Sequence, residues 1–334
     1  MVRIGVVGAG VVGLTTATFL QEALPEASVV ILADRFLQDT VSDGAAGIFR
    51  PGLQFQGPTP EITRKWLKDS YTYYKNILDS DKAAEAGVKS LSGYALSSKH
   101  PNIVKNSLLE PLVDEFRPCT KAELELHNMK YGSFVTTLLT ECRRYQPYLT
   151  NIFKRRGGRI IQRKITSFEE LADDFDIVCN CSGIGAKELC GDMTVTPIRG
   201  QVFKVRAPWI KNFFYTDYDT YILPGFDLIT VGGTRQFDSY NDELCPHDAA
   251  AIWERAIAIL PSLKEGEIVR QWVGLRPYRP MVRVEKEIMT FNNGKKLKVV
   301  HNYGHGGYGV MSSPGTSMHA VALVKELLQP KSLL

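Results

Sequence analysis

Short apolar runs and amphipathic segments alternate along the first forty residues of the chain. Residues 2–7 form an apolar, β-rich run that predicts a buried strand, and apolar positions at helical spacing over 14–20 predict a helix after it. A second apolar run at 29–32 predicts another strand, which leads to Asp34. The order strand, helix, strand predicts two parallel strands joined by a crossover helix, and therefore an α/β fold.

The middle of the chain continues this mixed pattern. Thr59 followed by Pro60 predicts the start of a helix, because proline is favoured at the first helical position. Apolar spacing predicts a further helix over 132–142, with Phe134 and Leu138 facing inward. Additional strands are predicted at 91–97, 159–165 and 176–181.

The pattern becomes β-rich from about residue 195. Short apolar runs at 200–205, 221–223 and 228–232 are separated by turn signals and predict strands. Residues 212–219 form an aromatic, polar segment between them. The sequence leaves two interpretations of this segment open, a lid over a pocket or a solvated hairpin loop.

Composition narrows the class of protein. A length of 334 residues predicts two domains, and 44% hydrophobic with 23% charged residues is ordinary for a globular protein. The net charge of +4 is spread along the chain without a basic arm, so we do not expect a nucleic-acid partner. No apolar run reaches the length of a membrane span, and Met1 leads directly into a strand rather than a signal peptide.

The six cysteines form no C-x-x-C pair. Cys179 and Cys181 lie in an apolar run, as buried free thiols do. We therefore expect free thiols and a reducing compartment.

The first predicted turn carries the sequence G-x-G-x-x-G. Gly8 allows a tight turn, Gly10 lets a pyrophosphate approach the backbone, and Gly13 lets the helix pack against the strand. The helix N-terminus then faces the phosphates, and Asp34 is placed to bind a ribose diol. This motif predicts a dinucleotide site, but it does not by itself distinguish NAD from FAD.

Residues 40–47 favour FAD. They are small, hydroxyl-bearing or glycine residues, which let a chain run close to a ligand. A second segment that contacts the ligand at this point suits an extended cofactor better than NAD.

Two later glycine-rich turns extend the predicted site. Residues 180–185 follow a predicted strand, at the edge of the sheet where ligands bind. Residues 301–309 carry four glycines and precede a helix that we expect to follow Ser313-Pro314-Gly315. Such a helix start favours negative charge, including charge on a reduced isoalloxazine ring. His301 and His305 have no third ligand cluster nearby, so no metal site is predicted.

Arg276 is the candidate for substrate binding. Glycine and proline residues bracket it in the sequence 273–280, and a fixed guanidinium suits bidentate binding of a carboxylate. The sequence alone also allows a surface salt bridge. No nucleophile or metalloprotease motif is present, and a chain without evident acid–base groups suits hydride transfer to a cofactor.

These motifs together resemble the D-amino acid oxidase family over nearly the whole chain. The stretches that carry the resemblance are 4–14, 42–47, 180–183, 199–201, 232–236, 274–277 and 301–307. The resemblance implies a Rossmann-type FAD-binding domain interleaved with a β-rich α+β substrate domain. The implied division assigns 1–50, 135–192 and 285–334 to the FAD-binding domain, and 51–134 with 193–284 to the substrate domain.

The resemblance also implies which residues bind FAD. They come from the glycine-rich turns, from the end of the second strand and from the segment after it. They are Gly8, Gly10, Val11, Val12, Gly13, Asp34, Arg35, Thr40, Ser42, Ala46, Gly47, Ile165, Ser182, Gly183, Gly307, Tyr308, Gly309, Val310 and Met311.

Four residues are implied to bind the substrate. Arg276 matches the arginine that binds the α-carboxylate, Tyr221 the tyrosine that assists it, and Gly307 the backbone that faces the amine. Arg235 matches the position that distinguishes the branch acting on acidic substrates, D-aspartate and D-glutamate. We expect an unpaired Arg235 to make neutral side chains bind poorly. Activity on neutral or a broad range of D-amino acids stays the alternative.

The implied reaction is an oxidative deamination. The neutral amine binds, the α-hydrogen leaves as hydride to flavin N5, and dioxygen is the final acceptor. The products are a 2-oxo acid, ammonia and hydrogen peroxide, and no catalytic acid or base from the protein is expected. Two other classes stay open, a silent FAD-binding protein and an NAD-dependent dehydrogenase.

Several residues depart from the family pattern. Arg50 stands where relatives usually lack an arginine, and it either contacts an acidic substrate or points to solvent. Met311 and the pair Ser313-Pro314 replace residues that are polar or aromatic in relatives, which bears on cofactor contacts. The final residues 332–334, Ser-Leu-Leu, differ from the peroxisomal signal Ser-Lys-Leu by lacking its basic residue. We expect the peroxisome through an import receptor, otherwise the cytoplasm, and the oligomeric state stays open.

Overall fold

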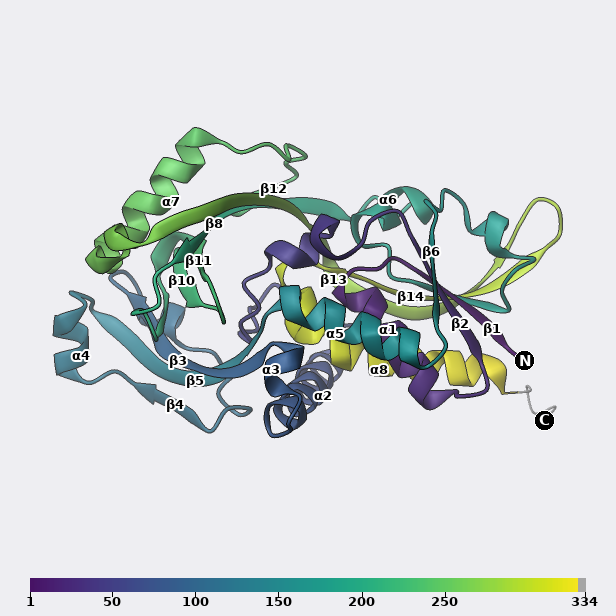
Figure 1. Ribbon diagram of the computed structural model, residues 1–334, viewed down its shortest axis with the longest axis horizontal. Coiled ribbons are helices and arrows are strands. Elements are labelled where there is room, and N and C mark those ends of the chain that lie inside the picture. The colour runs from purple at the N-terminus through teal and green to yellow at the C-terminus, as the bar shows by residue number, and fades with distance from the viewer. Residues whose placement is uncertain (330–334) are drawn as a thin grey trace.

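One long, mixed sheet runs the length of the molecule (Figure 1). The computed structural model describes residues 1–329. Along the sheet the strands follow the order β4-β5-β3-β9-β10-β11-β8-β13-β14-β7-β1-β2-β6, and β12 pairs with β8. Helices cover the sheet, and α7 lies at the end opposite the N-terminus. The α/β fold predicted from the sequence is confirmed.

The end of the sheet nearest the N-terminus is parallel, as the sequence predicts for a dinucleotide-binding unit. Neighbouring strands pair in parallel from β14 through β7, β1 and β2 to β6. Its strands are β1 (Arg3–Val7), β2 (Ser28–Ala33), β6 (Arg159–Gln162), β7 (Ile177–Asn180) and β14 (Lys296–His305). Its helices are α1 (Val11–Ala23), α5 (Cys142–Arg155), α6 (Ala186–Leu189) and α8 (Gly309–Leu328).

The other end of the sheet is mostly antiparallel. Its strands are β3 (Val88–Ser97), β4 (Glu115–Pro118), β5 (Tyr131–Thr140), β8 (Thr196–Arg206), β9 (Phe213–Tyr215), β10 (Tyr221–Pro224), β11 (Ile229–Gly232), β12 (Gln236–Phe237) and β13 (Glu267–Thr290). The accompanying helices are α2 (Pro60–Leu78), α3 (Ala83–Ala86), α4 (Lys121–Leu126) and α7 (Pro246–Ile259). The strand β13 joins the two ends, because it pairs with β8 on one side and β14 on the other.

The helix predicted over 132–142 is wrong. Residues 131–140 form the strand β5, which pairs with β3 along its whole length. Burial alternates through Ser133, Val135 and Thr137, the period of a strand rather than a helix. The β-branched residues at 135–137 favour this outcome, and the apolar spacing of Phe134 and Leu138 was a poor guide.

The start of the last helix is also different from the prediction. The helix α8 begins at Gly309 and includes Pro314, so it starts before the position predicted for its first residue. Pro314 cannot donate a hydrogen bond to the carbonyl of Val310, but the Tyr74 hydroxyl donates to that oxygen at 2.6 Å. A bond from the Gly315 amide to the Ser70 hydroxyl, at 2.8 Å, supports the next turn. Contacts from α2 therefore hold a proline inside α8.

Other predictions about the whole chain have mixed outcomes. The helix start at Thr59 is confirmed, since its hydroxyl accepts a bond from the Ile62 amide. The six cysteines are free thiols. The predicted domain division stays a prediction, and its boundaries at 134 and 284 fall inside β5 and β13. Within residues 1–329, no helix combines the length and the apolar composition that a membrane crossing requires.

Candidate cofactor and substrate site

The predicted cofactor residues follow the carboxyl ends of five adjacent parallel strands. The glycine-rich turn follows β1, Asp34 and Arg35 follow β2, and Ser182 follows β7. Ile165 lies after β6, and the turn 306–309 follows β14. Ligands of such sheets bind beyond the carboxyl ends of the strands, so this arrangement supports a single extended site.

The turn after β1 has the close packing that the sequence predicts. A Cβ atom on Gly8, whose φ is +107°, would lie 2.3 Å from the Cys181 carbonyl oxygen. A Cβ on Gly13 would lie 2.0 Å from the Gly8 carbonyl, whereas one on Gly10 would meet nothing closer than 3.4 Å. Gly10 begins α1 without a side-chain cap, and the first turn has no acidic residue. The amides there suit a phosphate group.

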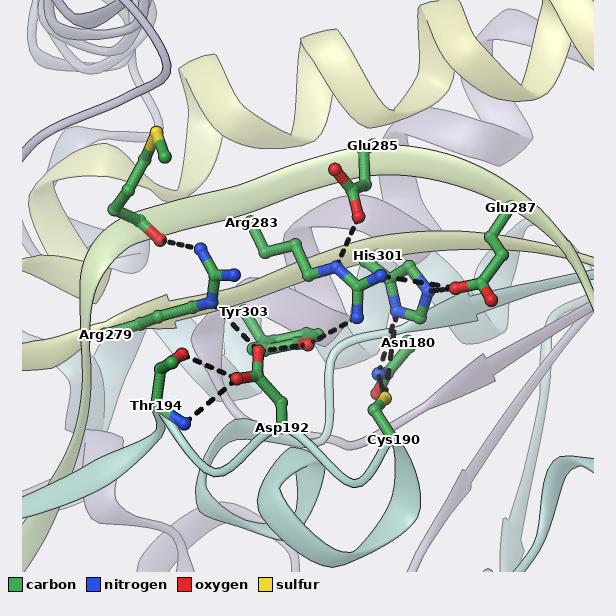
Figure 2. A network of polar contacts seen from close by, with 11 residues as sticks. Asn180, Cys190, Asp192, Thr194, Arg279, Arg283, Glu285, Glu287, His301 and Tyr303 are labelled. Carbon is green, nitrogen blue, oxygen red and sulfur yellow. Dashed lines mark hydrogen bonds and ion pairs between the residues drawn. The ribbon is translucent and has the colours of Figure 1, made fainter.

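A buried polar network holds the turn that follows β7 (Figure 2). The Asn180 side-chain oxygen accepts bonds from the Ser182 amide at 3.2 Å and hydroxyl at 2.7 Å. Its nitrogen contacts His301 Nδ1 at 3.2 Å, and His301 Nε2 lies 3.0 Å from Glu287. Burial lowers the pKa of His301 to about 4, so neutral His301 accepts from Asn180 and donates to Glu287. His301 therefore fixes the Asn180 side chain, and Asn180 in turn positions Ser182.

The segment 40–47 is anchored by an acidic residue that the sequence analysis did not single out. Asp43 is buried, and its carboxylate accepts bonds from Arg143 at 3.0 Å and Arg270 at 2.9 Å. These bonds join the segment to α5 and β13. The Ser42 hydroxyl accepts from the Val11 amide at 3.1 Å, which brings the segment to the start of α1. These bonds hold the segment that carries the residues predicted to bind FAD, which are Thr40, Ser42, Ala46 and Gly47.

The turn before α8 lies near the start of α1, since a Cβ on Gly309 would lie 3.8 Å from Val12 Cγ2. Gly307 is exposed, Tyr308 and Gly309 are half-buried, and Val310 and Met311 are buried. No acidic residue occupies the first turn of α8, and no side chain caps it. This helix start can stabilise negative charge, although it lies at Gly309 rather than after Gly315.

Two glycines leave room for the side chain of Arg276. Arg276 lies in β13, and its Nη1 donates to the Thr234 carbonyl at 3.0 Å. A Cβ on Gly200, in the adjacent strand β8, would lie 2.1 Å from Arg276 Nη2. A Cβ on Gly307 would lie 3.3 Å from Arg276 Cδ. The predicted substrate residues Arg276 and Gly307 are therefore neighbours, and Arg276 forms no ion pair within residues 1–329.

Tyr221 lies beside Arg276 at the start of β10. A Cβ on Gly232 would lie 2.5 Å from the Tyr221 hydroxyl, so β11 leaves space for the ring. Burial raises the pKa of Tyr221, and the positive charge of Arg276 opposes that rise. The Tyr221 ring stacks on Tyr215, with centroids 5.9 Å apart and an interplanar angle of 12°.

Arg235 reaches the same region but is not unpaired. Its Nη2 lies 3.3 Å from the Asp219 carboxylate, and its Nη1 contacts the Gln54 side chain. Desolvation lowers the pKa of Arg235, and Asp219, Tyr215 and Tyr308 more than offset this effect. The expectation of an unpaired arginine is therefore wrong, because Asp219 already supplies a carboxylate.

The segment 212–219, which supplies Asp219, is neither a lid nor a simple loop. Residues 213–215 form the strand β9, between β3 and β10. A short turn follows, and the Asp219 carbonyl accepts a bond from the Gly233 amide at 2.9 Å. This turn brings Asp219 to Arg235, a contact that sequence spacing gave no means of predicting.

Arg50 lies against the same aromatic stack. Its guanidinium carbon is 3.9 Å from the centroid of the Tyr215 ring. Arg50 is half-buried, so the alternative in which it simply points to solvent does not describe its position.

Comparisons with known proteins agree with this arrangement. A family model described as DAO, FAD dependent oxidoreductase, matches residues 3–323. The chain belongs to this family. Human D-aspartate oxidase is 40% identical over 327 residues, which cover 97% of this chain and 95% of the human protein. D-aspartate oxidase 1 of Caenorhabditis elegans is 35% identical over 343 residues, 99% of each chain. A D-amino acid oxidase of Dugesia ryukyuensis is 34% identical over 332 residues, 98% of each chain.

Solved structures agree on the fold. Glycine oxidase from Geobacillus kaustophilus superposes with a TM-score of 0.78 at 17% identity, covering 98% of this chain and 95% of that chain. Glycine oxidase from Bacillus cereus gives a TM-score of 0.76 at 18% identity, covering 98% and 96%.

The residues present fit FAD, the cofactor of the family. Gly10 leaves open space at the start of α1, where a phosphate needs close approach to backbone amides. Asp34 is exposed at the carboxyl end of β2, where a ribose diol would meet it. The start of α8 offers a second uncapped helix terminus for the other end of the cofactor. Both the family and these three features of the site therefore support FAD as the dinucleotide.

Proposed function

We propose that the chain oxidises acidic D-amino acids, D-aspartate and D-glutamate, to 2-oxo acids, ammonia and hydrogen peroxide. One observation carries this proposal: the Arg276 guanidinium donates to the carbonyl of Thr234, the residue next to Arg235, so the two arginines meet at one site beside Tyr221. Two cations at one tyrosine suit a substrate with two carboxylates. The similarity to human D-aspartate oxidase supports the same substrate class.

Each substrate residue has a role in this proposal. Arg276 binds the α-carboxylate in two parallel hydrogen bonds, and the Tyr221 hydroxyl donates a further bond to it. The exposed backbone of Gly307 faces the amine. Arg235 binds the side-chain carboxylate, so binding fixes the α-carbon from both sides.

The protein orients the substrate rather than exchanging its protons. Burial raises the pKa of Tyr221, so its hydroxyl is protonated at neutral pH and acts as a donor, not a base. Bound FAD supplies the acceptor for the α-hydride at N5 and the route by which the electrons reach dioxygen.

The test is a peroxide-coupled assay with added FAD across a panel of D-amino acids. We expect the highest kcat/KM for D-aspartate or D-glutamate. Replacing Arg235→Gln is expected to lower kcat/KM for D-aspartate more than for D-alanine. If the variant lost both activities equally, Arg235 would have no role in recognising the side chain.

A preference for neutral or a broad range of D-amino acids is the second candidate. The ion pair between Arg235 and Asp219 favours it, because a neutral side chain would not leave Arg235 without a carboxylate. Faster turnover of D-alanine than of D-aspartate by the wild-type protein would establish this alternative.

We also propose the domain division and the cellular location stated from the sequence. The parallel end of the sheet supports an FAD-binding domain assembled from separate segments of the chain. The residues of the possible import signal, 332–334, lie outside the described residues. Deleting them and following a fluorescent fusion in cells would test peroxisomal import.

A further inference from the structure

Arg50 is a cation without a carboxylate partner in the part of the chain that the structure describes. Its guanidinium stacks on Tyr215 at 3.9 Å, and no acidic oxygen within residues 1–329 lies within 4.0 Å of it. A cavity of about 10 Å³ borders Arg50, and no acidic side chain lines it. By contrast, Asp219 pairs with the neighbouring Arg235. Arg50 therefore retains a positive charge that the surrounding protein does not balance.

The backbone holds Arg50 in place from both sides. The Phe49 amide donates to the Leu138 carbonyl at 2.7 Å, and the Phe49 carbonyl accepts from the Thr137 hydroxyl at 2.8 Å. On the other side, the Pro51 carbonyl accepts a bond from the Asn106 side chain at 2.8 Å. Such a fixed attachment limits the entropy lost when a ligand binds.

The same short segment leads to the other residues of the substrate site. A Cβ on Gly52 would lie 2.2 Å from the Tyr308 hydroxyl, and Gln54 contacts Arg235. Burial and the Asp219 carboxylate raise the pKa of Tyr215, whereas the charges of Arg50 and Arg235 oppose that rise. Arg50 and Arg235 therefore act on one aromatic ring, which in turn stacks on Tyr221.

The charges of the site match a substrate with two carboxylates. Among the charged residues that act on Tyr215 and Tyr221, Arg276, Arg235 and Arg50 carry three positive charges and Asp219 carries one negative charge, which leaves a net charge of +2. An acidic D-amino acid with a neutral amine has a charge of −2. Without Arg50 the site would have a net charge of +1, which matches the single carboxylate of a neutral D-amino acid.

We infer that Arg50 determines substrate specificity by binding the side-chain carboxylate of an acidic D-amino acid together with Arg235, beside the ring of Tyr215. This inference rests on the proposed function and deepens it. Because the Asp219 carboxylate already pairs with Arg235, the positive charge of Arg50 accounts for a preference for acidic substrates that Arg235 alone would not provide. A role limited to stacking would leave the ratio of acidic to neutral turnover unchanged.

The test compares kcat/KM for D-aspartate and D-alanine in Arg50→Gln. Loss of a hydrogen-bonded charge pair is expected to lower the D-aspartate to D-alanine ratio about 10- to 100-fold. The matched control is Lys99→Gln, because Lys99 also lies 3.9 Å from a tyrosine centroid, that of Tyr218, and carries the same charge. The control is expected to keep the wild-type ratio.

A binding measurement separates recognition from turnover. Flavin absorbance reports the Kd of succinate, which has two carboxylates, and of butyrate, which has one. Arg50→Gln is expected to weaken succinate binding about 10- to 100-fold more than butyrate binding. Equal effects on the two ligands would overturn the inference.

A second substitution tests the charge balance directly. Combining Arg50→Gln with Asp219→Asn returns the net charge to +2 and frees Arg235, so it is expected to recover much of the D-aspartate preference. A double variant as unselective as Arg50→Gln would overturn the charge argument. If Arg50→Gln does not fold, Asp219→Asn alone carries the test: it is expected to raise the ratio, and an unchanged ratio counts against the inference.

The outcomes distinguish this inference from the proposed function. If the wild-type protein does not oxidise acidic D-amino acids, the proposed function fails. If it does, and Arg50→Gln keeps the wild-type ratio, only the inference about Arg50 fails.

Discussion

The substitution Gly200→Ala tests whether the position of Arg276 controls substrate binding. Gly200 lies in β8, where its missing side chain leaves space for the Arg276 guanidinium. An added Cβ would lie 2.1 Å from Nη2, 2.3 Å from Cζ and 2.5 Å from Nη1 of Arg276. Carbon contacts are ordinarily about 3.5–4.0 Å, so the guanidinium must move by at least about 1 Å.

That displacement predicts the size of the effect. A misplacement of about 1 Å in a binding group can cost about 100-fold in rate. Loss of a charge-assisted hydrogen bond, about 1.5–3 kcal/mol, gives a similar range of about 10- to 150-fold. We therefore expect kcat/KM to fall about 100-fold. The fold should persist, because alanine fits an extended strand and the displaced group is the end of a flexible side chain.

The assay is kcat/KM for both D-aspartate and D-alanine, at saturating FAD. Both substrates share the α-carboxylate, so both values are expected to fall alike, in contrast to the selective effect of Arg50→Gln. The matched control is Gly185→Ala, whose Cβ would meet no heavy atom closer than 3.7 Å and which is expected to keep wild-type values. Wild-type kcat/KM in a folded, FAD-loaded Gly200→Ala protein would refute the role of Arg276.

Three further predictions concern stability and cofactor binding. Tyr74→Phe leaves the Val310 carbonyl without its 2.6 Å partner and is expected to lower the free energy of unfolding by about 1–3 kcal/mol in urea titrations; Tyr73→Phe, which loses only a 3.4 Å contact, should cost less. Burial lowers the pKa of Lys204 from 10.5 to about 8. Between about pH 8 and 10.5 the unfolded chain therefore binds more protons at Lys204 than the folded chain does, and the free energy of unfolding rises with pH. Lys204→Met is therefore expected to raise the free energy of unfolding at pH 7 by up to about 3 kcal/mol, measured in urea titrations. An unchanged free energy of unfolding would show that the buried charge of Lys204 does not destabilise the fold. Asp43→Asn removes the carboxylate between two arginines and is expected to weaken FAD binding, measured by fluorescence titration of the apoprotein; unchanged affinity would show that the segment 40–47 does not depend on this anchor.

The β-α-β unit that carries the proposed cofactor residues could be predicted from sequence because its determinants are local. The residues of the glycine-rich turn, the following helix and Asp34 all lie within one β-α-β unit, so chain order alone fixes their arrangement. The helix predicted over 132–142 failed for the opposite reason. The strand β5 is stabilised by its pairing with β3, some forty residues earlier in the chain, and apolar spacing carries no information about that partner.

The charge balance of the substrate site could not be predicted, because its four charged residues come from distant parts of the chain. A sequence motif marks Arg235 and Arg276, but Asp219 reaches Arg235 only through a turn whose carbonyl is bonded to Gly233. Arg50 reaches the site through bonds that fix the residues on either side of it to β5 and to Asn106. The proposed roles of these arginines imply that substrate specificity in this chain depends on how many carboxylates the protein itself contributes beside them. A sequence motif that contains only the arginines carries no information about those carboxylates. We therefore expect relatives that share an arginine at the position of Arg235 to differ in their preference for acidic substrates.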